Sequence, residues 1–356
     1  MKRRAEKKGM IVLCVTARGL KLSKGIAKAS MGAKVVSPDE IRAAGIRKKA
    51  AEAFKSSSAV VFISATGIAV RAIAPLVKAK HLDPAVVVVD ERGQFSISLL
   101  SGHLGGANSL AKDIAAATGA LPVITTATDI WGLPCVEDIS REFGLHIEDP
   151  KKIKAANAAI LEGSRVYVVD GNSARLKSIK ARFNQRPFVF RKSVPGRLKA
   201  GEAVVLITSG AEKPPKEISS RTLVMRPKEV VAGIGCRRGA TKEDIRKALT
   251  RAMKAASLSP GSLRCIATID LKKDEKGLRD LAEDLGLDIR FFKGARLRKA
   301  GCESTPSAFV EKITGAGGVA EPAALLASGA ERLCLKKIKS TRVTVALARA
   351  PFMSSE

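Results

Sequence analysis

Residues 59–77 read AVVFISATGIAVRAIAPLV and contain two patterns of apolar residues, one directly after the other. Ala59–Ala65 is a short run rich in β-branched residues, which is typical of a strand buried on both faces of a sheet. Gly67–Val77 follows at once and has the composition of a helix. A buried strand joined directly to a helix is the repeating unit of a parallel α/β sheet.

The same alternation continues on both sides of this stretch and defines an N-terminal α/β domain over residues 1–138. Strands and helices of these lengths in alternation predict a parallel sheet covered by helices. The expected strands are Met10–Thr16, Ala59–Ala65, Ala85–Asp90 and Pro122–Thr125. The expected helices are Gly19–Ala29, Glu40–Lys55, Gly67–Val77 and Gly106–Thr118.

Two further domains are expected after residue 138. Residues 139–227 predict a smaller α/β middle domain, because short strands alternate there with Pro- and Gly-containing turns and few helices. Its strands are Tyr167–Asp170, Phe188–Phe190 and Ala203–Thr208. Residues 228–356 return to strand–helix alternation and predict a C-terminal α/β domain. The fold class is therefore α/β, with two outer domains of mainly parallel sheets joined by the middle domain.

The C-terminal domain carries its own start signals. Thr241 precedes an expected helix over Lys242–Ala256, and Asp244 stands at the third position of a capping box. The other expected helices are Glu275–Leu285, Pro306–Thr314 and Glu321–Leu326. The expected strands are Val230–Ile234, Cys265–Ile269, Asp288–Phe292 and Thr341–Ala348.

The charge balance points to an anionic ligand. Lys and Arg number 63 against 34 Asp and Glu, which gives a formal net charge of +29. The basic excess is even, at 9, 10 and 10 charges in residues 1–138, 139–227 and 228–356. With no basic arm, 4% aromatic residues and one Trp, the chain lacks the stacking platforms of specific nucleic-acid binders. A small substrate rich in carboxylates fits this pattern better.

Membrane, disulfide and metal classes are not favoured. No apolar run approaches the 18 residues or so of a transmembrane helix, so we expect a cytoplasmic protein with no membrane partner. The six cysteines are scattered, without a C-x-x-C pair or a neighbouring pair of histidines. This pattern predicts neither a disulfide framework nor a zinc site, and we expect no protein-held metal.

Ligands of parallel sheets bind beyond the carboxyl ends of the strands. Three segments lie just past the ends of expected strands, and a fourth follows an apolar, strand-like run; all four are predicted to share one edge of the N-terminal sheet. They are Ser64–Arg71, Asp90–Glu91, Ser101–Asn108 and Thr125–Asp129. The chemistry of this domain is therefore expected there.

Ser101–Asn108, SGHLGGAN, holds one of three histidines in the chain. Three interpretations compete. Gly102, Gly105 and Gly106 could simply permit a tight turn, with Asn108 or the next serine capping the helix. The turn could bind an anion at the helix N-terminus, although no phosphate-loop spacing is present. It could also present His103 for acid–base work, because small neighbours leave room for a substrate.

A second glycine-rich turn, GIGCRRGA over Gly233–Ala240, opens the C-terminal domain. Its spacing departs from the dinucleotide fingerprint, since Arg238 stands where the third glycine belongs. Gly235, Arg237 and Arg238 could instead bind carboxylates, because arginine forms paired hydrogen bonds with them. A solvated arginine pair on a tight turn is the alternative. Glu321, at a later helix start, is favoured by the helix dipole without any function.

Several of these stretches together resemble one known family. SATGIAVRAIAPLV, DPAVVVVDERGQFSISLLSGHLGGANSLAKDIA and GALPVITTATD are similar to the N-terminal domain of the cobalamin-biosynthesis protein G family. VVAGIGCRRGATKEDI, ATIDLKKDEKGL and TPSAFVEKITGAGGVAEPAALLASGA are similar to its C-terminal domain. The resemblance covers both outer thirds of the chain, and the middle third matches loosely.

The resemblance implies cobalt-precorrin-5A hydrolase activity in anaerobic cobalamin biosynthesis. Such an enzyme opens the δ-lactone of a cobalt-bearing tetrapyrrole and releases acetaldehyde, giving cobalt-precorrin-5B. The substrate brings its own cobalt, so no cofactor is expected. Transient contact with other enzymes of the pathway is expected. A non-catalytic carrier or scaffold for tetrapyrrole intermediates is the alternative, since the charge and both turns would serve it equally.

Lactone hydrolysis needs a base, oxyanion donors and an acid, and the residues above supply candidates for each. His103 is the expected base or acid, and Asp90 or Glu91 is expected to orient it or the water. The N–H groups around Gly105–Gly106 and the hydroxyls of Thr125 and Thr126 are the expected oxyanion donors. The predicted substrate-binding residues are Arg71, Gly102, Gly105, Gly106, Asn108, Gly235, Arg237 and Arg238.

Overall fold

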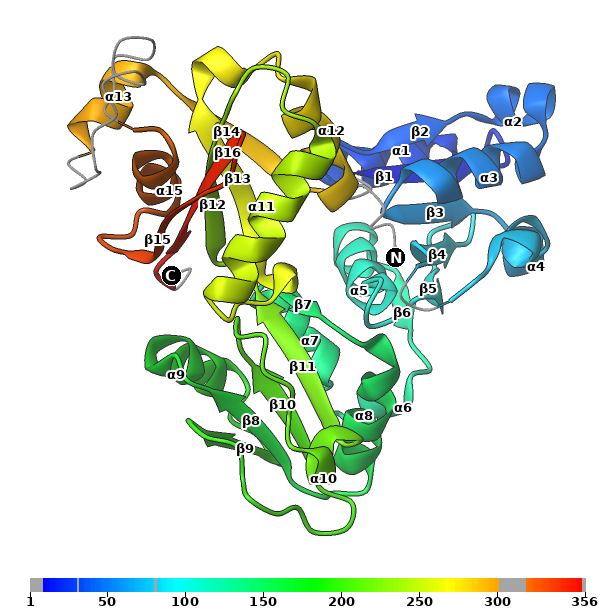
Figure 1. Cartoon of the computed structure of the whole chain (residues 1–356). Helices are drawn as coiled ribbons and strands as arrows, with labels where there is room; N and C mark the ends of the chain where they lie inside the picture. Colours follow the sequence, from blue (N-terminus) through cyan, green and yellow to red (C-terminus); the bar gives the residue numbers. More distant parts are fainter. Residues whose placement is uncertain (1–8, 31, 80–81, 301–317, 354–356) are drawn as a thin grey trace. The chain divides into compact units, whose positions relative to one another are not determined.

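A computed structural model describes residues 9–30, 32–79, 82–300 and 318–353. They divide into two compact units, one before and one after the boundary between Arg141 and Glu142. Three separate sheets with flanking helices build these units, two of them in the second unit (Figure 1). The predicted α/β class with mainly parallel sheets is confirmed. The expected helix Pro306–Thr314 lies outside the described residues.

The first unit contains a six-stranded sheet in the order β2-β1-β3-β4-β5-β6. Its strands are β1 (Met10–Cys14), β2 (Lys34–Val36), β3 (Ala59–Ile63), β4 (Ala85–Val89), β5 (Phe95–Leu100) and β6 (Leu121–Val123). Its helices are α1 (Leu20–Ala29), α2 (Pro38–Ala44), α3 (Ile46–Ser56), α4 (Thr66–Ile73), α5 (Ala107–Thr118), α6 (Ala127–Ile130) and α7 (Val136–Glu142), with the short η1 (Ala74–Leu76).

Alternation along the strands explains how both faces of this sheet are covered. Val60 and Phe62 point to one face, where they pack with residues of α2, α3 and α4. Val61 and Ile63 point to the other face and pack with residues of α1 and α5. Because every residue from Val60 to Ile63 is fully buried, β3 reads as the continuous apolar run that a central strand requires.

Two expectations for this unit are wrong. The single helix expected over Glu40–Lys55 is broken at Gly45, whose φ of +83° ends α2 and begins α3. Sheet direction also changes, because β5 runs antiparallel to β4. Only residues 90–94 join these two strands, too few for the crossover helix that parallel neighbours need. Since β6 is parallel to β5, the carboxyl ends of β5 and β6 lie opposite those of β1, β3 and β4.

The second unit begins with a five-stranded sheet in the order β7-β11-β10-β8-β9. Its strands are β7 (Leu145–Ile147), β8 (Val166–Asp170), β9 (Phe188–Arg191), β10 (Ala203–Ile207) and β11 (Thr222–Pro227). All pairs are parallel except that of β7 with β11. Its helices are α8 (Ile153–Leu161), α9 (Ser173–Arg182) and α10 (Lys216–Ser219), after the short η2 (Pro150–Lys152). Sequence patterns missed β7 and β11.

The third sheet has the order β14-β13-β12-β16-β15 and closes the described chain. Its strands are β12 (Val230–Cys236), β13 (Leu263–Ile269), β14 (Asp288–Phe292), β15 (Leu333–Lys339) and β16 (Val343–Arg349). Its helices are α11 (Lys242–Ala255), α12 (Lys276–Leu285), α13 (Gly294–Lys299) and α15 (Ala320–Ser328), with η3 (Pro260–Ser262) and η4 (Asp270–Lys272). The predicted capping box of Thr241 and Asp244 is confirmed at the start of α11.

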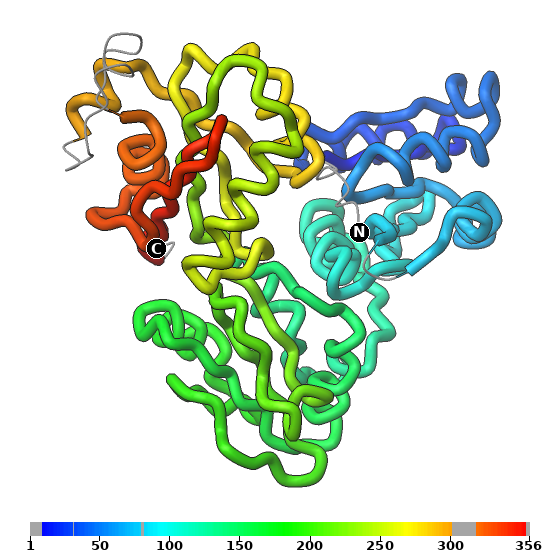
Figure 2. Tube along the Cα trace, in the orientation of Figure 1, coloured from blue at the N-terminus to red at the C-terminus, as the bar shows by residue number. Residues whose placement is uncertain are grey.

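In the third sheet the last strand in chain order, β16, lies next to the first, β12. β16 pairs antiparallel with β12 along its whole length, as the red and yellow-green traces show (Figure 2). Helix α15 packs so closely on β12 that a Cβ at Gly233 would lie 1.8 Å from the carbonyl oxygen of Ala320. Only glycine fits this position, so the first glycine of GIGCRRGA is explained by packing.

A buried ionic network joins the middle sheet to the third sheet. Arg175 of α9 donates to Asp170 through Nε at 2.6 Å and through Nη2 at 3.1 Å. Its Nη1 donates to Glu229, just before β12, at 2.8 Å. The side chains of Arg175 and Asp170 are 5% and 1% exposed. The Arg175 guanidinium also lies over the ring of Phe352 in the C-terminal tail, 5.9 Å from its centroid.

Candidate functional site

The glycine-rich turn SGHLGGAN joins β5 to α5 and has a backbone that few residues other than glycine allow. Ser101 adopts a φ of +59° and Gly106 a φ of +85°. A Cβ at Gly102 would lie 2.6 Å from Asn108 Oδ1, and one at Gly105 would lie 2.4 Å from Ser101 Cβ. Close packing within the turn therefore requires Gly102 and Gly105, and the positive φ favours glycine at position 106.

Three of the N–H groups in this turn donate to carbonyls of the turn itself. The N–H groups of Ala107 and Asn108, at the start of α5, donate to the carbonyls of Ser101 and Gly102. The Gly106 N–H donates to the carbonyl of His103 at 3.1 Å. These donors are used inside the turn, so Gly106 is not available as the expected oxyanion donor.

His103 meets the segment that follows β6. Its Nε2 lies 3.0 Å from Oδ2 of Asp129 and 3.1 Å from Oγ1 of Thr128. The two side chains of the His103–Asp129 pair are 15% and 19% exposed, so solvent still reaches both. Because β5 and β6 are parallel, their carboxyl ends bring SGHLGGAN and TTATD to one edge of the sheet, as the sequence predicts.

Asn108 holds this corner together. Its buried side-chain amide donates through Nδ2 to Thr126 Oγ1 at 3.0 Å and to Asp129 Oδ2 at 2.8 Å. Its Oδ1 accepts from Ser98 Oγ of β5 at 2.6 Å. Both amide hydrogens are thus used between elements of the protein, which leaves Asn108 no donor for a substrate.

Cations surround the pair, although they are not those expected from the sequence. Lys112 of α5, 58% exposed, lies 3.0 Å from the second oxygen of Asp129. Arg141 of α7 donates to the carbonyl of His103 at 3.2 Å.

The nearby Cys135 thiol donates to Asp138, and burial raises its pKa well above that of a free cysteine. Cys135 is therefore protonated at neutral pH and is no nucleophile.

The expected placement of Asp90 and Glu91 beside His103 is wrong. Both lie in the hairpin between β4 and β5, at the opposite edge of the sheet. A five-residue strand, roughly 16 Å long, separates the two edges. Asp90 accepts from the N–H groups of Arg92 at 2.9 Å and Phe95 at 2.6 Å, so its carboxylate shapes the hairpin. Arg71 is exposed on α4, which begins at that same far edge.

Two threonines complete the predicted set. Thr126 is the residue before α6, and its Oγ1 accepts from Asn108 while its own hydroxyl hydrogen remains. Thr125 precedes it and is exposed. Trp131 follows α6 and is 75% exposed. Its backbone N–H donates to the carbonyl of Ala127.

The turn GIGCRRGA in the second unit binds a carboxylate of the protein itself. The Gly239 N–H donates to Glu275 Oε1 at 2.6 Å, and Lys272 Nζ lies 3.1 Å from Glu275 Oε2. A Cβ at Gly235 would lie 2.6 Å from Thr344 Oγ1 of β16, so this glycine is explained by packing. Arg237 and Arg238 are exposed at the turn.

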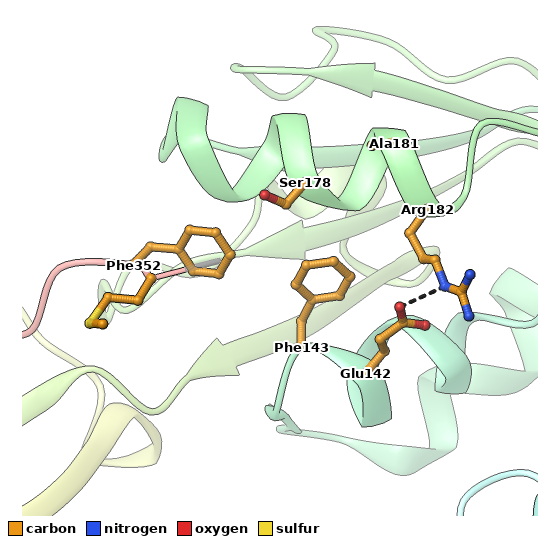
Figure 3. A pocket seen from close by; sticks show the side chains of 7 residues that line it. Glu142, Phe143, Ser178, Ala181, Arg182 and Phe352 are labelled. Atoms are coloured by element: carbon orange, nitrogen blue, oxygen red, sulfur yellow. Dashed lines mark hydrogen bonds and ion pairs between the residues drawn. The ribbon is translucent and has the colours of Figure 1, made fainter. Parts of the chain in front are cut away.

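The second unit also has a surface cavity of about 430 Å³. Its lining residues include the ring of Phe143, which stacks on that of Phe352 at a centroid distance of 6.4 Å (Figure 3). Glu142 and Arg182, which also line the cavity, form an ion pair at 2.7 Å (Figure 3). The lining contains no histidine.

Asp129, Thr128, Lys112 and Arg141 were not among the predicted site residues. One signal for Asp129 was present, because TTATD follows a strand and Asp129 is its carboxylate. The contacts of Lys112 and Arg141 depend on helix positions that patterns do not reveal. Within the described ranges, no three His, Cys, Asp or Glu side chains are grouped as metal ligands would be. Nor is any helix of those ranges long and apolar enough to span a membrane.

Fold and site together define a three-sheet α/β protein with a partly exposed histidine–carboxylate pair at a glycine-rich turn. Family models match most of the chain: "Cobalamin synthesis G N-terminal" over residues 48–129, "Cobalamin biosynthesis central region" over 134–227 and "Cobalamin synthesis G C-terminus" over 230–348. The chain belongs to the cobalamin synthesis protein G family.

Relatives in two bacteria extend over most of the chain. It is 35% identical over 303 residues to the "Cobalt-precorrin-5A hydrolase" of Priestia megaterium, covering 84% of this chain and 80% of the relative. It is 35% identical over 344 residues to the protein of the same name from Salmonella typhimurium, covering 94% and 96%. A cobalamin biosynthesis protein G homolog from Sulfolobus solfataricus has a solved structure with 20% identity, a TM-score of 0.40 and coverage of 98% and 99%.

Proposed function

We propose that this protein is a cobalt-precorrin-5A hydrolase. The observation that carries the proposal is 35% identity to a relative of that name along 94% of this chain and 96% of the relative. A hydrolase also gives a use to a histidine–carboxylate pair that solvent reaches. The alternative of a non-catalytic carrier is not favoured. A carrier needs no histidine–carboxylate pair, and both relatives are named as hydrolases.

The reaction that we propose has two parts. Water adds to the carbonyl carbon of the δ-lactone, and the ester C–O bond breaks to give a carboxylate and an alcohol. The alcohol then loses its proton as its C–O bond becomes a C=O bond, and the adjacent carbon–carbon bond breaks to release acetaldehyde. The electron pair of that bond passes to the macrocycle, which takes up a proton. One water is consumed, and no oxidant or reductant is needed.

His103 is the proposed base for the first part and the proposed acid for the departing oxygen. Its position at a partly exposed turn gives water access, and general acid–base catalysis contributes about 10²–10⁴-fold to a rate. The hydroxyls of Thr125 and Thr126 are the proposed oxyanion donors. Arg141, exposed beside His103, is a proposed contact for the carboxylates of the substrate.

Other parts of the proposal concern the surroundings of the reaction. The substrate brings its own cobalt, so no protein ligand to the metal and no cofactor are proposed. Arg237 and Arg238 are proposed to bind peripheral carboxylates of the anionic tetrapyrrole, because both are exposed at a turn. We also propose a cytoplasmic location, where other enzymes of the pathway would be transient partners.

The test is incubation of the protein with the cobalt-bearing lactone under anaerobic conditions. We expect trapped acetaldehyde and a macrocycle that has gained one water and lost one acetaldehyde. His103→Gln should lower kcat by about 10²–10⁴-fold. His146→Gln removes a histidine from the second unit and serves as the matched control, with kcat unchanged. No acetaldehyde from the wild-type protein would refute the function, and a fully active His103→Gln variant would remove His103 from the mechanism.

A further inference from the structure

The contact between His103 and Asp129 uses only one of the two ring nitrogens. Asp129 Oδ2 and Thr128 Oγ1 both approach Nε2, at 3.0 Å and 3.1 Å. Among the residues that the structure describes, none forms a hydrogen bond to Nδ1. The two described partners of the ring therefore both face Nε2.

Hydrogen bonds from other residues hold the Asp129 carboxylate in a fixed position beside the ring of His103. Asn108 donates to Oδ2 and Lys112 to Oδ1, at 2.8 Å and 3.0 Å. The backbone on either side is also fixed, because Ile130 N–H donates to Thr126 and Leu133 N–H donates to Thr128. A carboxylate held by an amide and an ammonium group is an acceptor only, so it favours the ring state that carries a hydrogen on the facing nitrogen, Nε2.

A neutral imidazole carries its hydrogen on one nitrogen, and the hydrogen bond at that nitrogen decides which. When the hydrogen is on Nε2, which faces Asp129 Oδ2 at 3.0 Å and Thr128 Oγ1 at 3.1 Å, Nδ1 carries the lone pair. We propose that Asp129 is a positioning residue that keeps the hydrogen of His103 on Nε2 and so makes Nδ1 the nitrogen that accepts a proton from water. This inference rests on the proposed function for its substrate, although not for the state of the ring.

The proton path follows from this assignment. Nδ1 takes one hydrogen of the attacking water, and the remaining hydroxide adds to the lactone carbonyl carbon. Nδ1–H then protonates the oxygen that leaves when the ester C–O bond breaks. During these steps the positively charged ring lies 3.0 Å from the Asp129 carboxylate, which stabilises it.

Asp129→Asn tests the role because it keeps the shape of the side chain and replaces an acceptor by an amide that can donate. The amide favours a ring with its lone pair on Nε2, which places the hydrogen on Nδ1 and removes the base. In a histidine–aspartate pair of this kind, such a change lowers kcat by about 10⁴-fold. We expect a fall in kcat of about 10³–10⁴-fold with KM changed less than about threefold.

Asp113→Asn is the matched control. Asp113 is exposed on α5 beside Lys112. Its replacement by Asn removes one negative charge, as Asp129→Asn does, at a residue that has no described contact with His103. We expect the kcat of this variant to equal that of the wild type. Asp129→Glu restores the carboxylate on a longer side chain and should recover part of the kcat lost in Asp129→Asn. A structural role for Asp129 predicts instead that the glutamate variant is no better than the asparagine variant.

A direct readout does not depend on catalysis. The chain has three histidines, so proton–nitrogen correlation spectra of the imidazoles resolve each ring after assignment with His103→Gln and His146→Gln. We expect wild-type His103 at neutral pH to carry its hydrogen on Nε2 and to lose this preference in Asp129→Asn. A hydrogen on Nδ1 in the wild-type protein overturns the inference even if the protein is a hydrolase. The expected ring state without acetaldehyde release would refute the proposed function alone.

Discussion

Replacement of Arg175 by Met is expected to destabilise the second unit strongly. Arg175 is 5% exposed and makes three hydrogen bonds to two carboxylates. Glu229 retains Arg349, at 3.4 Å, after the change. In the described part of the chain, the hydrogen bond that remains to the Asp170 carboxylate is that from the N–H of Asn172, at 2.8 Å, and the carboxylate stays buried. Breaking a buried ion pair in this way costs about 3–5 kcal/mol, because one charge is left without its partner.

The pH dependence of this loss has a definite sign. Burial raises the pKa of Asp170 above its ordinary value, and the hydrogen bonds and charge of Arg175 oppose that rise. Without Arg175 the pKa of Asp170 rises further, so the folded variant holds a proton that the unfolded chain releases above about pH 4. Below the pKa of Asp170 in the folded wild type, both folded proteins hold this proton and the difference between them is constant. Above that pKa the wild type has released the proton and the variant has not, so the stability of the variant relative to wild type should decrease as the pH rises, by up to about 1.4 kcal/mol per pH unit.

Arg182→Met is the matched control, because it makes the same substitution on the same helix α9. Arg182 also pairs with a carboxylate, Glu142, yet its side chain is 69% exposed. An exposed pair contributes about 0–1 kcal/mol. The assay is urea denaturation followed by circular dichroism at pH 5 and pH 8, together with amide exchange in α9 to locate the loss. Equal midpoints for the two variants at pH 8 would refute the reasoning.

Two further predictions concern glycines and arginines. Gly233→Ala forces a Cβ to within 1.8 Å of the Ala320 carbonyl oxygen and should lower the free energy of unfolding by about 3 kcal/mol. Gly25→Ala in α1 meets nothing within 4 Å and should raise it slightly, which is the contrast to measure. The double variant R237A/R238A should weaken substrate binding by about tenfold or more at moderate salt. Unchanged affinity would exclude the arginine pair from the site.

Much of the fold follows from local patterns in the sequence. Continuous β-branched runs such as Ala85–Asp90 identify the buried strands, and the Thr241–Asp244 box marks the start of α11. β5 was not among the expected strands, although an apolar, strand-like run stands there, and its antiparallel direction was missed with it. The short connection over residues 90–94 indicates that direction. A parallel neighbour needs about a dozen connecting residues, so five indicate a hairpin. Counting that loop would have moved Asp90 and Glu91 away from His103.

The candidate site was only partly predictable for a related reason. His103 and the TTATD segment were expected at one edge, and β5 and β6 bring them there. The role of Asn108 as a bridge was not visible, because an asparagine after glycines reads equally well as a helix cap. The contacts of Lys112 and Arg141 also arise from tertiary packing. Their sequence neighbours do not distinguish them from other exposed cations on helices.

The single tryptophan has a practical consequence. Trp131 follows the helix that carries Asp129, and 75% of it is exposed to solvent. Because the chain has no other indole, its intrinsic fluorescence comes from this one place beside the His103–Asp129 pair. Indole emission lies in the near-ultraviolet, where a conjugated macrocycle absorbs, so a tetrapyrrole bound here would quench it by energy transfer. The protein thus carries a native optical reporter, and occupancy of this corner can be titrated without a label or a turnover assay.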